Sequence, residues 1–154
     1  MSIDTFASWL DQTPLSEALK NSALIIPAAQ SVHILSVAII VSDAALALLV
    51  ALGLAGADWP LARWIGATGR RLGWALGALL ATGTLLVAAE PTRELPNAAL
   101  RLKIALLVPV IAYALWQRRR LARAEPAAAP RIATAVSLAL WVVVVGLGRW
   151  IAYA

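Results

Sequence analysis

Four long, nearly uncharged apolar stretches limit what this chain can fold into more than any other feature. Apolar residues make up 62% of the 154 residues, and the mean hydropathy is +0.82. A bilayer accommodates such segments, because each helix crossing its core of about 30 Å needs about 20 apolar residues. Four helices would use nearly the whole chain. We therefore predict an all-α fold, a four-helix transmembrane bundle in one domain over residues 1–154.

The predicted membrane spans follow from where the charges interrupt the apolar stretches. They cover residues 29–54, 70–89, 98–117 and 132–150. Pro27 is a natural place for a kink or a restart of the first helix, and Pro109 should kink the third. Before the first span, apolar residues of 3–10 recur at helical spacing, which predicts a short interfacial helix on the membrane surface. The Thr13-Pro14 pair then has the pattern of an N-cap and first position of a further helix.

The distribution of basic residues predicts the topology. On one side of the membrane lie Arg63, Arg70, Arg71, Arg118, Arg119, Arg120, Arg123 and Arg131. On the other lie Lys20, Arg93, Arg101, Lys103 and Arg149, together with acidic residues. The positive-inside rule then places both termini outside the inner (cytoplasmic) membrane of a bacterium. The net charge of +5 is explained by these loop arginines beside lipid rather than by nucleic acid.

The composition excludes several kinds of site. Cysteine is absent, so disulfides, thiolate metal sites and iron–sulfur clusters are excluded. Met1 is the only methionine and His33 the only histidine, so one chain supplies neither a bis-histidine nor a His/Met haem site. A haem would have to be five-coordinate, be shared across a dimer, or take a different second ligand.

Three polar residues of the first span are the leading candidates for a functional site. His33, Ser36 and Asp43 fall within roughly 80° of one helix face at 100° per residue. Asp43 lies about 15 Å along the helix from His33, too far for direct contact. Ionisable groups are costly in hydrocarbon, so they mark candidate sites. Asp43 and Ser36 form a possible intramembrane proton or polar site, in which Asp43 needs a partner or a proton.

Polar groups at the outer ends of the helices could converge on His33. Glu90, Arg93 and Arg101 would form an outer-face rim. His33 could ligate a metal or a haem whose carboxylates pair with Lys103 or Arg149. Simpler interpretations stay open. His33 would then hydrogen-bond a neighbouring helix, the two basic side chains would extend to the interface, and Glu90 would cap it.

A glycine pattern on the second span predicts close helix packing. Gly69, Gly73 and Gly77 recur at intervals of four, which is typical of a small-xxx-small face. Such a face packs either inside the bundle or between subunits. A homo-oligomer or a complex with a partner membrane subunit is therefore expected.

Several segments together resemble a known family. They are FASWLDQTPLSEAL, QSVHILSVAIIVSD, NAALRLKIALLV and GLGRWIAYA. In this order they resemble an uncharacterised bacterial family of small four-helix membrane proteins. More remotely, a histidine early in the first helix and a lysine opening the third are similar to HemJ-type protoporphyrinogen oxidases and CopD-type copper-resistance proteins. The HemJ likeness implies haem b on His33, with Lys103 as a substrate or propionate partner.

Three functional hypotheses follow. The first is a membrane protein with a ligand or cofactor pocket near its outer face, for which haem b is the best-motivated ligand. The second is a non-catalytic accessory or anchor subunit of a membrane complex. The third is a proton-coupled transporter that uses Asp43 and acts as an oligomer.

Overall fold

The computed structural model describes residues 2–56, 60–121 and 129–151. Within these ranges the chain is helical, as predicted. The helices are α1 (Ile3–Asp11), α2 (Pro14–Lys20), α3 (Ile25–Ala51), α4 (Leu61–Ala89), α5 (Pro91–Glu94), α6 (Ala98–Leu121) and α7 (Ala129–Ile151). Among the described residues, four helices are long and apolar enough to cross a membrane, namely α3, α4, α6 and α7. The chain is thus an all-α, multi-pass membrane protein.

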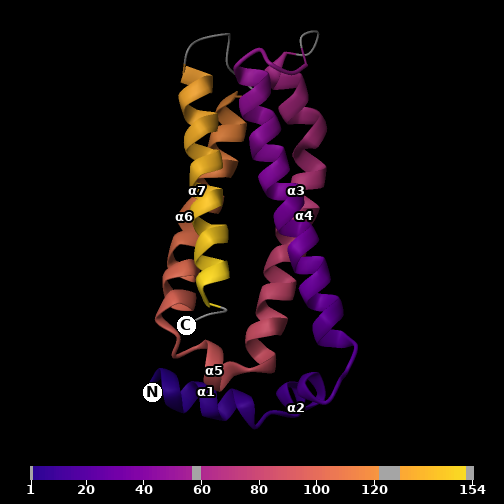
Figure 1. The fold of residues 1–154 in the computed structure, drawn as a ribbon, viewed down its shortest axis with the longest axis vertical. Helices are drawn as coiled ribbons and strands as arrows, with labels where there is room; N and C mark the ends of the chain where they lie inside the picture. Colours follow the sequence, from indigo (N-terminus) through magenta and orange to yellow (C-terminus); the bar gives the residue numbers. More distant parts are fainter. Residues whose placement is uncertain (1, 57–59, 122–128, 152–154) are drawn as a thin grey trace.

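The four long helices stand side by side as two antiparallel pairs (Figure 1). The α3–α4 and α6–α7 pairs have the most extensive contacts, and α3 joins the pairs by packing on α7. At one end of the bundle, here called the loop end, α3 and α6 finish while α4 and α7 begin. At the other, the terminal end, lie α1, α2 and α5 and the finish of α7. An even number of spans brings both ends of the chain to this side.

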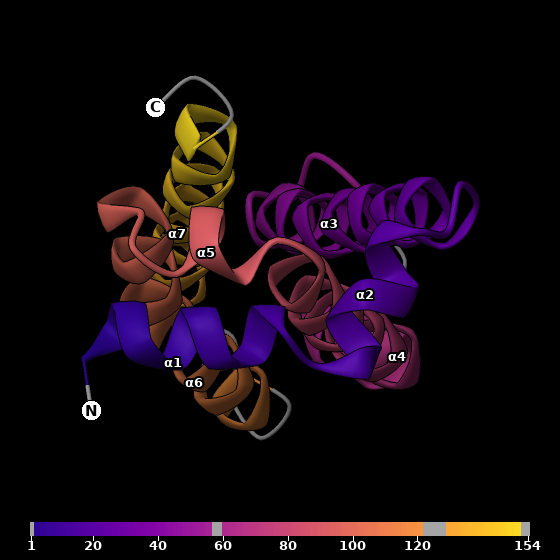
Figure 2. The same cartoon turned by 90° about the horizontal axis from the view of Figure 1, so that it is seen from below.

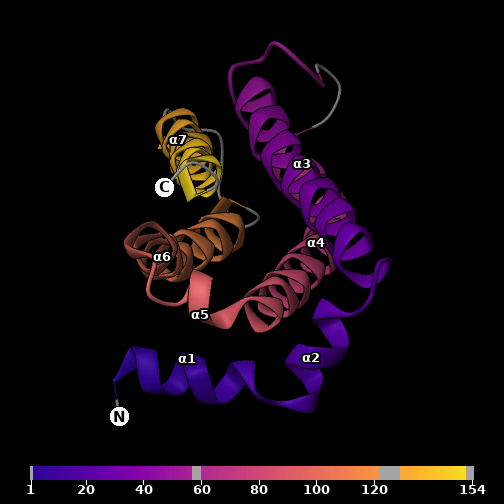
Figure 3. The same ribbon diagram turned by 60° about the horizontal axis from the view of Figure 1, so that its bottom comes forward.

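The short helices cover the terminal end of the bundle. Figures 2 and 3 show α1 and α2 running across it, with α5 between α1 and the long helices. The helix predicted at residues 3–10 is confirmed as α1, and its place on the membrane surface stays a prediction. It is capped by Ser2, whose hydroxyl accepts a hydrogen bond from the amide of Thr5. The start of α2 also follows the prediction. Thr13 caps it and Pro14 takes its first position, where no backbone donor is needed.

Two helix boundaries differ from the predicted ones for clear reasons. The first span begins at Ile25 instead of restarting after Pro27, because Pro27 lies in the first turn, where its missing N–H has no partner to lose. It ends at Ala51 because Gly53 adopts a left-handed conformation, with φ of 75°. The amides of Gly53 and Leu54 donate to the carbonyls of Val50 and Leu49 in a Schellman motif.

Two further features of the helices were not predicted. The segment at residues 61–69 is continuous with the second span, so that α4 runs from Leu61 to Ala89. A short helix, α5, follows Glu90.

Pro109 lies inside the unbroken helix α6. Asp58 and residues 122–128, which include Arg123, lie outside the described part of the chain.

The apolar core fills the middle of the bundle. Ile40 of α3, Leu76 of α4, Val110 of α6 and Trp141 of α7 are buried members of one cluster. Its members Ile40 and Trp141 line the same cavity as Asp43, toward the loop end, whereas His33 lies toward the terminal end. The polar groups of the chain therefore lie in two sites.

Candidate functional site

His33 is held against α4 by one hydrogen bond. Its Nδ1 lies 2.9 Å from Oγ1 of Thr82, a buried residue of α4. Gly83, next in sequence, makes room for the ring, since a Cβ there would lie 3.4 Å from the histidine Cε1. The simpler expectation, a hydrogen bond from His33 to a neighbouring helix, is therefore met at Nδ1.

The surroundings of Nδ1 favour one tautomer of the imidazole. The Thr82 hydroxyl lies 2.6 Å from the carbonyl of Ala78 and 3.3 Å from that of Leu79. A hydroxyl has one proton, so when Thr82 donates it to a carbonyl, its Oγ1 accepts from His33. Nδ1 then carries the proton, and in the neutral ring Nε2 bears the lone pair. The Leu79 carbonyl also acts on the ring as a hydrogen-bond acceptor.

Lys103 approaches this histidine from the other helix pair. It lies within Coulombic range of His33 and of Glu94. The side chain lies against Gly148 of α7, where a Cβ would come within 3.0 Å of Nζ. Two glycines thus make room for the two predicted ligand-binding side chains. Arg149 follows Gly148, is exposed, and takes part in an interaction of its own.

His33 and Lys103 supply the donor types that a haem with one protein ligand would use. In haem and metal sites the ligating histidine typically has its other ring nitrogen fixed by a hydrogen bond, and Thr82 Oγ1 lies within that distance of Nδ1. Lys103 would supply a cation for an anionic group of the cofactor. No cluster of three or more metal-ligating side chains occurs among the described residues, and His33 does not line the cavity described below.

Among the described residues, no hydrogen bond or ion pair joins the predicted outer-face rim of Glu90, Arg93 and Arg101 to His33. Arg93 instead pairs with Glu90 at 2.5 Å and with Glu94 at 3.7 Å, on and beside α5. Both Glu90 and Arg93 are exposed, and so is Arg101.

Asp43 lies in a separate site, and its partner was missed in the sequence. The residue is 3% exposed, and its Oδ2 accepts a hydrogen bond of 2.6 Å from Nη1 of Arg118. Nη2 of the same guanidinium donates to the Ile65 carbonyl at 2.6 Å and to Thr68 Oγ1 at 2.7 Å. Arg118 therefore ties α6 to both α3 and α4. Arg71 adds a longer contact of 3.4 Å to Oδ1.

The arginine run 118–120 was interpreted only as a topology signal, and nothing in its spacing identifies Arg118 as the partner of Asp43. The general rule that a buried carboxylate needs a cation indicated that a partner exists. Ser36, also singled out in the sequence, is buried, but its hydroxyl donates to the Val32 carbonyl of its own helix at 2.7 Å. It contributes to neither site by a hydrogen bond.

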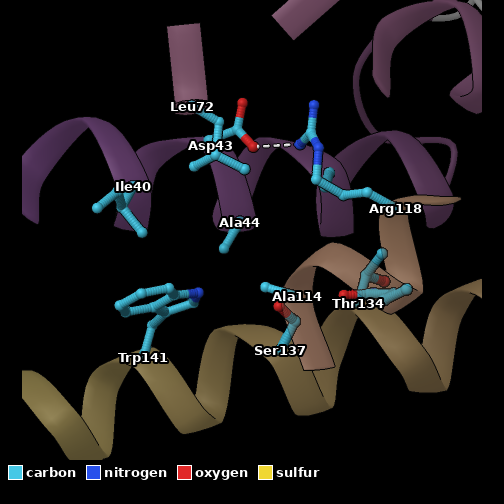
Figure 4. A pocket seen from close by; sticks show the side chains of 11 residues that line it. Ile40, Asp43, Ala44, Leu72, Ala114, Arg118, Thr134, Ser137 and Trp141 are labelled. Carbon is cyan, nitrogen blue, oxygen red and sulfur yellow. Dashed lines mark hydrogen bonds and ion pairs between the residues drawn. The ribbon is translucent and has the colours of Figure 1, made fainter. Parts of the chain in front are cut away.

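A small cavity adjoins the ion pair at the junction of the four long helices. Its volume is about 30 Å³. Figure 4 shows Asp43 and Arg118 on one side, with Thr134, Ser137 and Trp141 of α7 on the other. Gln117 of α6 also lines it.

The predicted glycine face is not used inside the bundle. Gly69, Gly73 and Gly77 are all exposed on α4. A Cβ at Gly73 or Gly77 would meet nothing within 4 Å, and one at Gly69 would lie 3.9 Å from Arg118 Nη2. Of the two roles considered for this face, packing between subunits remains a prediction.

Comparison with known proteins gives no relative for this chain. No family model, no curated protein and no solved structure matches it.

Proposed function

We propose that this membrane protein binds a metal-centred cofactor, haem b, through Nε2 of His33 near the terminal end of the bundle. The proposal rests on one observation above all, the commitment of the Thr82 hydroxyl to the Ala78 carbonyl. That hydrogen bond favours His33 as a donor at Nδ1, which would leave the lone pair of Nε2 for a ligand. Lys103 and Arg149 would pair with the anionic groups of the cofactor.

Bound in this way, haem would supply one-electron chemistry. Thr82 would fix the orientation of the His33 ring, and Lys103 would supply a positive charge for an anionic group of the cofactor. The remote likeness to HemJ-type proteins assigns the same two positions, His33 and Lys103. The aromatic and arginine-bearing continuation of that group is missing after His33, so the proposal concerns cofactor binding and not protoporphyrinogen oxidation. A CopD-like copper site has less support, because one histidine and no cysteine are present.

The test is a reduced-minus-oxidised absorption spectrum of the detergent-purified protein, before and after titration with haemin. We expect a Soret band that is lost in His33→Ala and kept in the control Ser31→Ala. Ser31 is an exposed residue of α3 whose hydroxyl bonds to its own helix. His33→Met, which restores a possible axial ligand, should keep a shifted band if the alanine variant merely loses its fold. A wild-type protein that remains colourless and shows no haemin-induced band would refute the proposal.

The exposed glycines favour a second candidate function, that of an accessory or anchor subunit. The face formed by Gly69, Gly73 and Gly77 lets another helix approach the α4 backbone closely. Cross-linking in membranes should then capture a second copy or a partner protein, and Gly73→Ile should abolish the product. Ala67→Ile, at an exposed position on another side of α4, is the matched control. Equal cross-linking in both variants would exclude this face as an interface.

A further inference from the structure

The cavity at the loop end holds an unusual set of polar groups for the inside of a membrane protein. Gln117 is 5% exposed and Ser137 is 7% exposed, and both side chains line it. Within the described residues, neither side chain takes part in a hydrogen bond. Asp43 Oδ1 has only the 3.4 Å contact with Arg71. Three helices, α3, α6 and α7, thus each bring one polar group with unused hydrogen-bonding capacity to the same small space.

Leaving such groups dry is costly. A buried donor or acceptor without a partner costs about 1–3 kcal/mol, and the cost applies separately to the amide of Gln117 and the hydroxyl of Ser137. Apolar cavities stay empty, whereas polar ones with two to four partners bind water. One water needs roughly 10–15 Å³ of such space. The cavity, at about 30 Å³, has room for it.

We infer that this cavity is an internal water site, in which one or two waters bridge Asp43 of α3, Gln117 of α6 and Ser137 of α7. The chemistry is complementary. The carboxylate accepts, the amide and the hydroxyl both donate and accept, and water does the same. The bridge joins α7 to the polar junction, to which the direct bonds of Arg118 attach only α3, α4 and α6. Figure 4 shows why it is needed, since Ser137 and Asp43 come from opposite walls of the pocket.

The ion pair explains why we infer water, and not an ion, as the occupant of this cavity. Asp43 already has a guanidinium at 2.6 Å, so its charge is compensated and a metal cation has little to gain there. An anion would lie beside the carboxylate of Asp43, and the two negative charges would repel each other. A neutral molecule with both donors and acceptors fits the lining, and the volume of about 30 Å³ suits one or two waters.

Two measurements on the full chain test this inference. The first is a crystal structure from a lipidic phase, at a resolution that shows ordered water. Density within hydrogen-bonding distance of Gln117 and Ser137 is expected. An empty cavity, or density for anything other than water, would overturn the inference.

The second measurement compares the melting temperatures of two alanine variants in detergent. Ser137→Ala removes a water partner, so its melting temperature should fall below that of Ser36→Ala. Ser36 is a matched control, since it is equally buried, bonds within its own helix and does not line the cavity. If the cavity is dry, Ser137→Ala removes an unpaired buried hydroxyl, and its melting temperature should equal or exceed the control. That result would contradict the inference without bearing on the His33 site.

Discussion

Arg118 makes the sharpest prediction for the stability of this bundle. Replacing it by methionine keeps most of the side-chain volume but removes three hydrogen bonds, to Asp43, Ile65 and Thr68. Asp43 then stays buried, with Arg71 as its remaining cation. Because Arg71 is 3.4 Å away and its side chain is 53% exposed, it compensates that charge only in part.

The magnitude follows from the nature of the pair. Removing one partner of a buried ion pair typically costs about 3–5 kcal/mol, because the other charge is left uncompensated. The remaining Arg71 contact places Arg118→Met at the lower end, about 3 kcal/mol. That is roughly a 100-fold change in the folding equilibrium, since about 1.4 kcal/mol is a factor of ten. Arg71→Met should cost only about 0–1 kcal/mol, as expected for a half-exposed pair.

Unfolding by sodium dodecyl sulfate in mixed micelles, followed by tryptophan fluorescence and circular dichroism, measures these differences. Arg119→Met is the matched control, because Arg119 is the next residue of α6 and is exposed. Its effect should stay within about 0.5 kcal/mol. The double variant Asp43→Asn/Arg118→Met should be more stable than Arg118→Met alone, since it removes the uncompensated charge.

Two results would refute this reasoning. One is an equal effect of Arg118→Met and Arg119→Met, which would mean that the buried guanidinium contributes no more than an exposed one. The other is a double variant at least as destabilised as Arg118→Met. Asp43 would then not carry an uncompensated charge when Arg118 is absent.

Three other predictions test separate parts of the structure. Thr82→Val should weaken haemin binding by roughly 10–100-fold by releasing the His33 ring, whereas the exposed control Thr84→Val should not, as a haemin titration would show. Gly53→Ala should lower the free energy of unfolding by about 1–2 kcal/mol because φ is 75° there, whereas Gly73→Ala, helical and without neighbours, should raise it by about 0.5–1 kcal/mol in the monomer. A stability loss at Gly73 would instead show that this face is packed. Trp141→Ala should cost about 3–5 kcal/mol in the same unfolding assay, because the ring is 4% exposed in the core; a loss below about 1 kcal/mol would contradict that packing.

Local patterns were enough to predict the elements of this fold. Thr13 and Pro14 identified the start of α2, and the apolar stretches identified the four candidate spans. The ends were less well predicted. The finish of the first span depended on the backbone of Gly53, and a glycine in a sequence does not reveal whether its φ will be positive.

The candidate site was predicted in part. His33 and Asp43 were singled out by the cost of placing an ionisable group in hydrocarbon, an argument that needs only the sequence. Their separation along one helix also follows from the sequence, because the rise per residue is fixed. Two polar sites instead of one were therefore implied. The rim of Glu90, Arg93 and Arg101 around His33 stays a prediction, with Arg93 paired to Glu90.

The sequence by itself determined that the chain is a four-span helical membrane protein and which of its buried groups need partners. Both conclusions follow from transfer free energies and helical periodicity, which are properties of single segments. Tertiary structure alone decided which residues those partners are: Thr82 for His33, and Arg118 for Asp43. Each partner comes from a different helix, many residues away in sequence. Which helices meet, and at what height, is set by packing of the whole bundle.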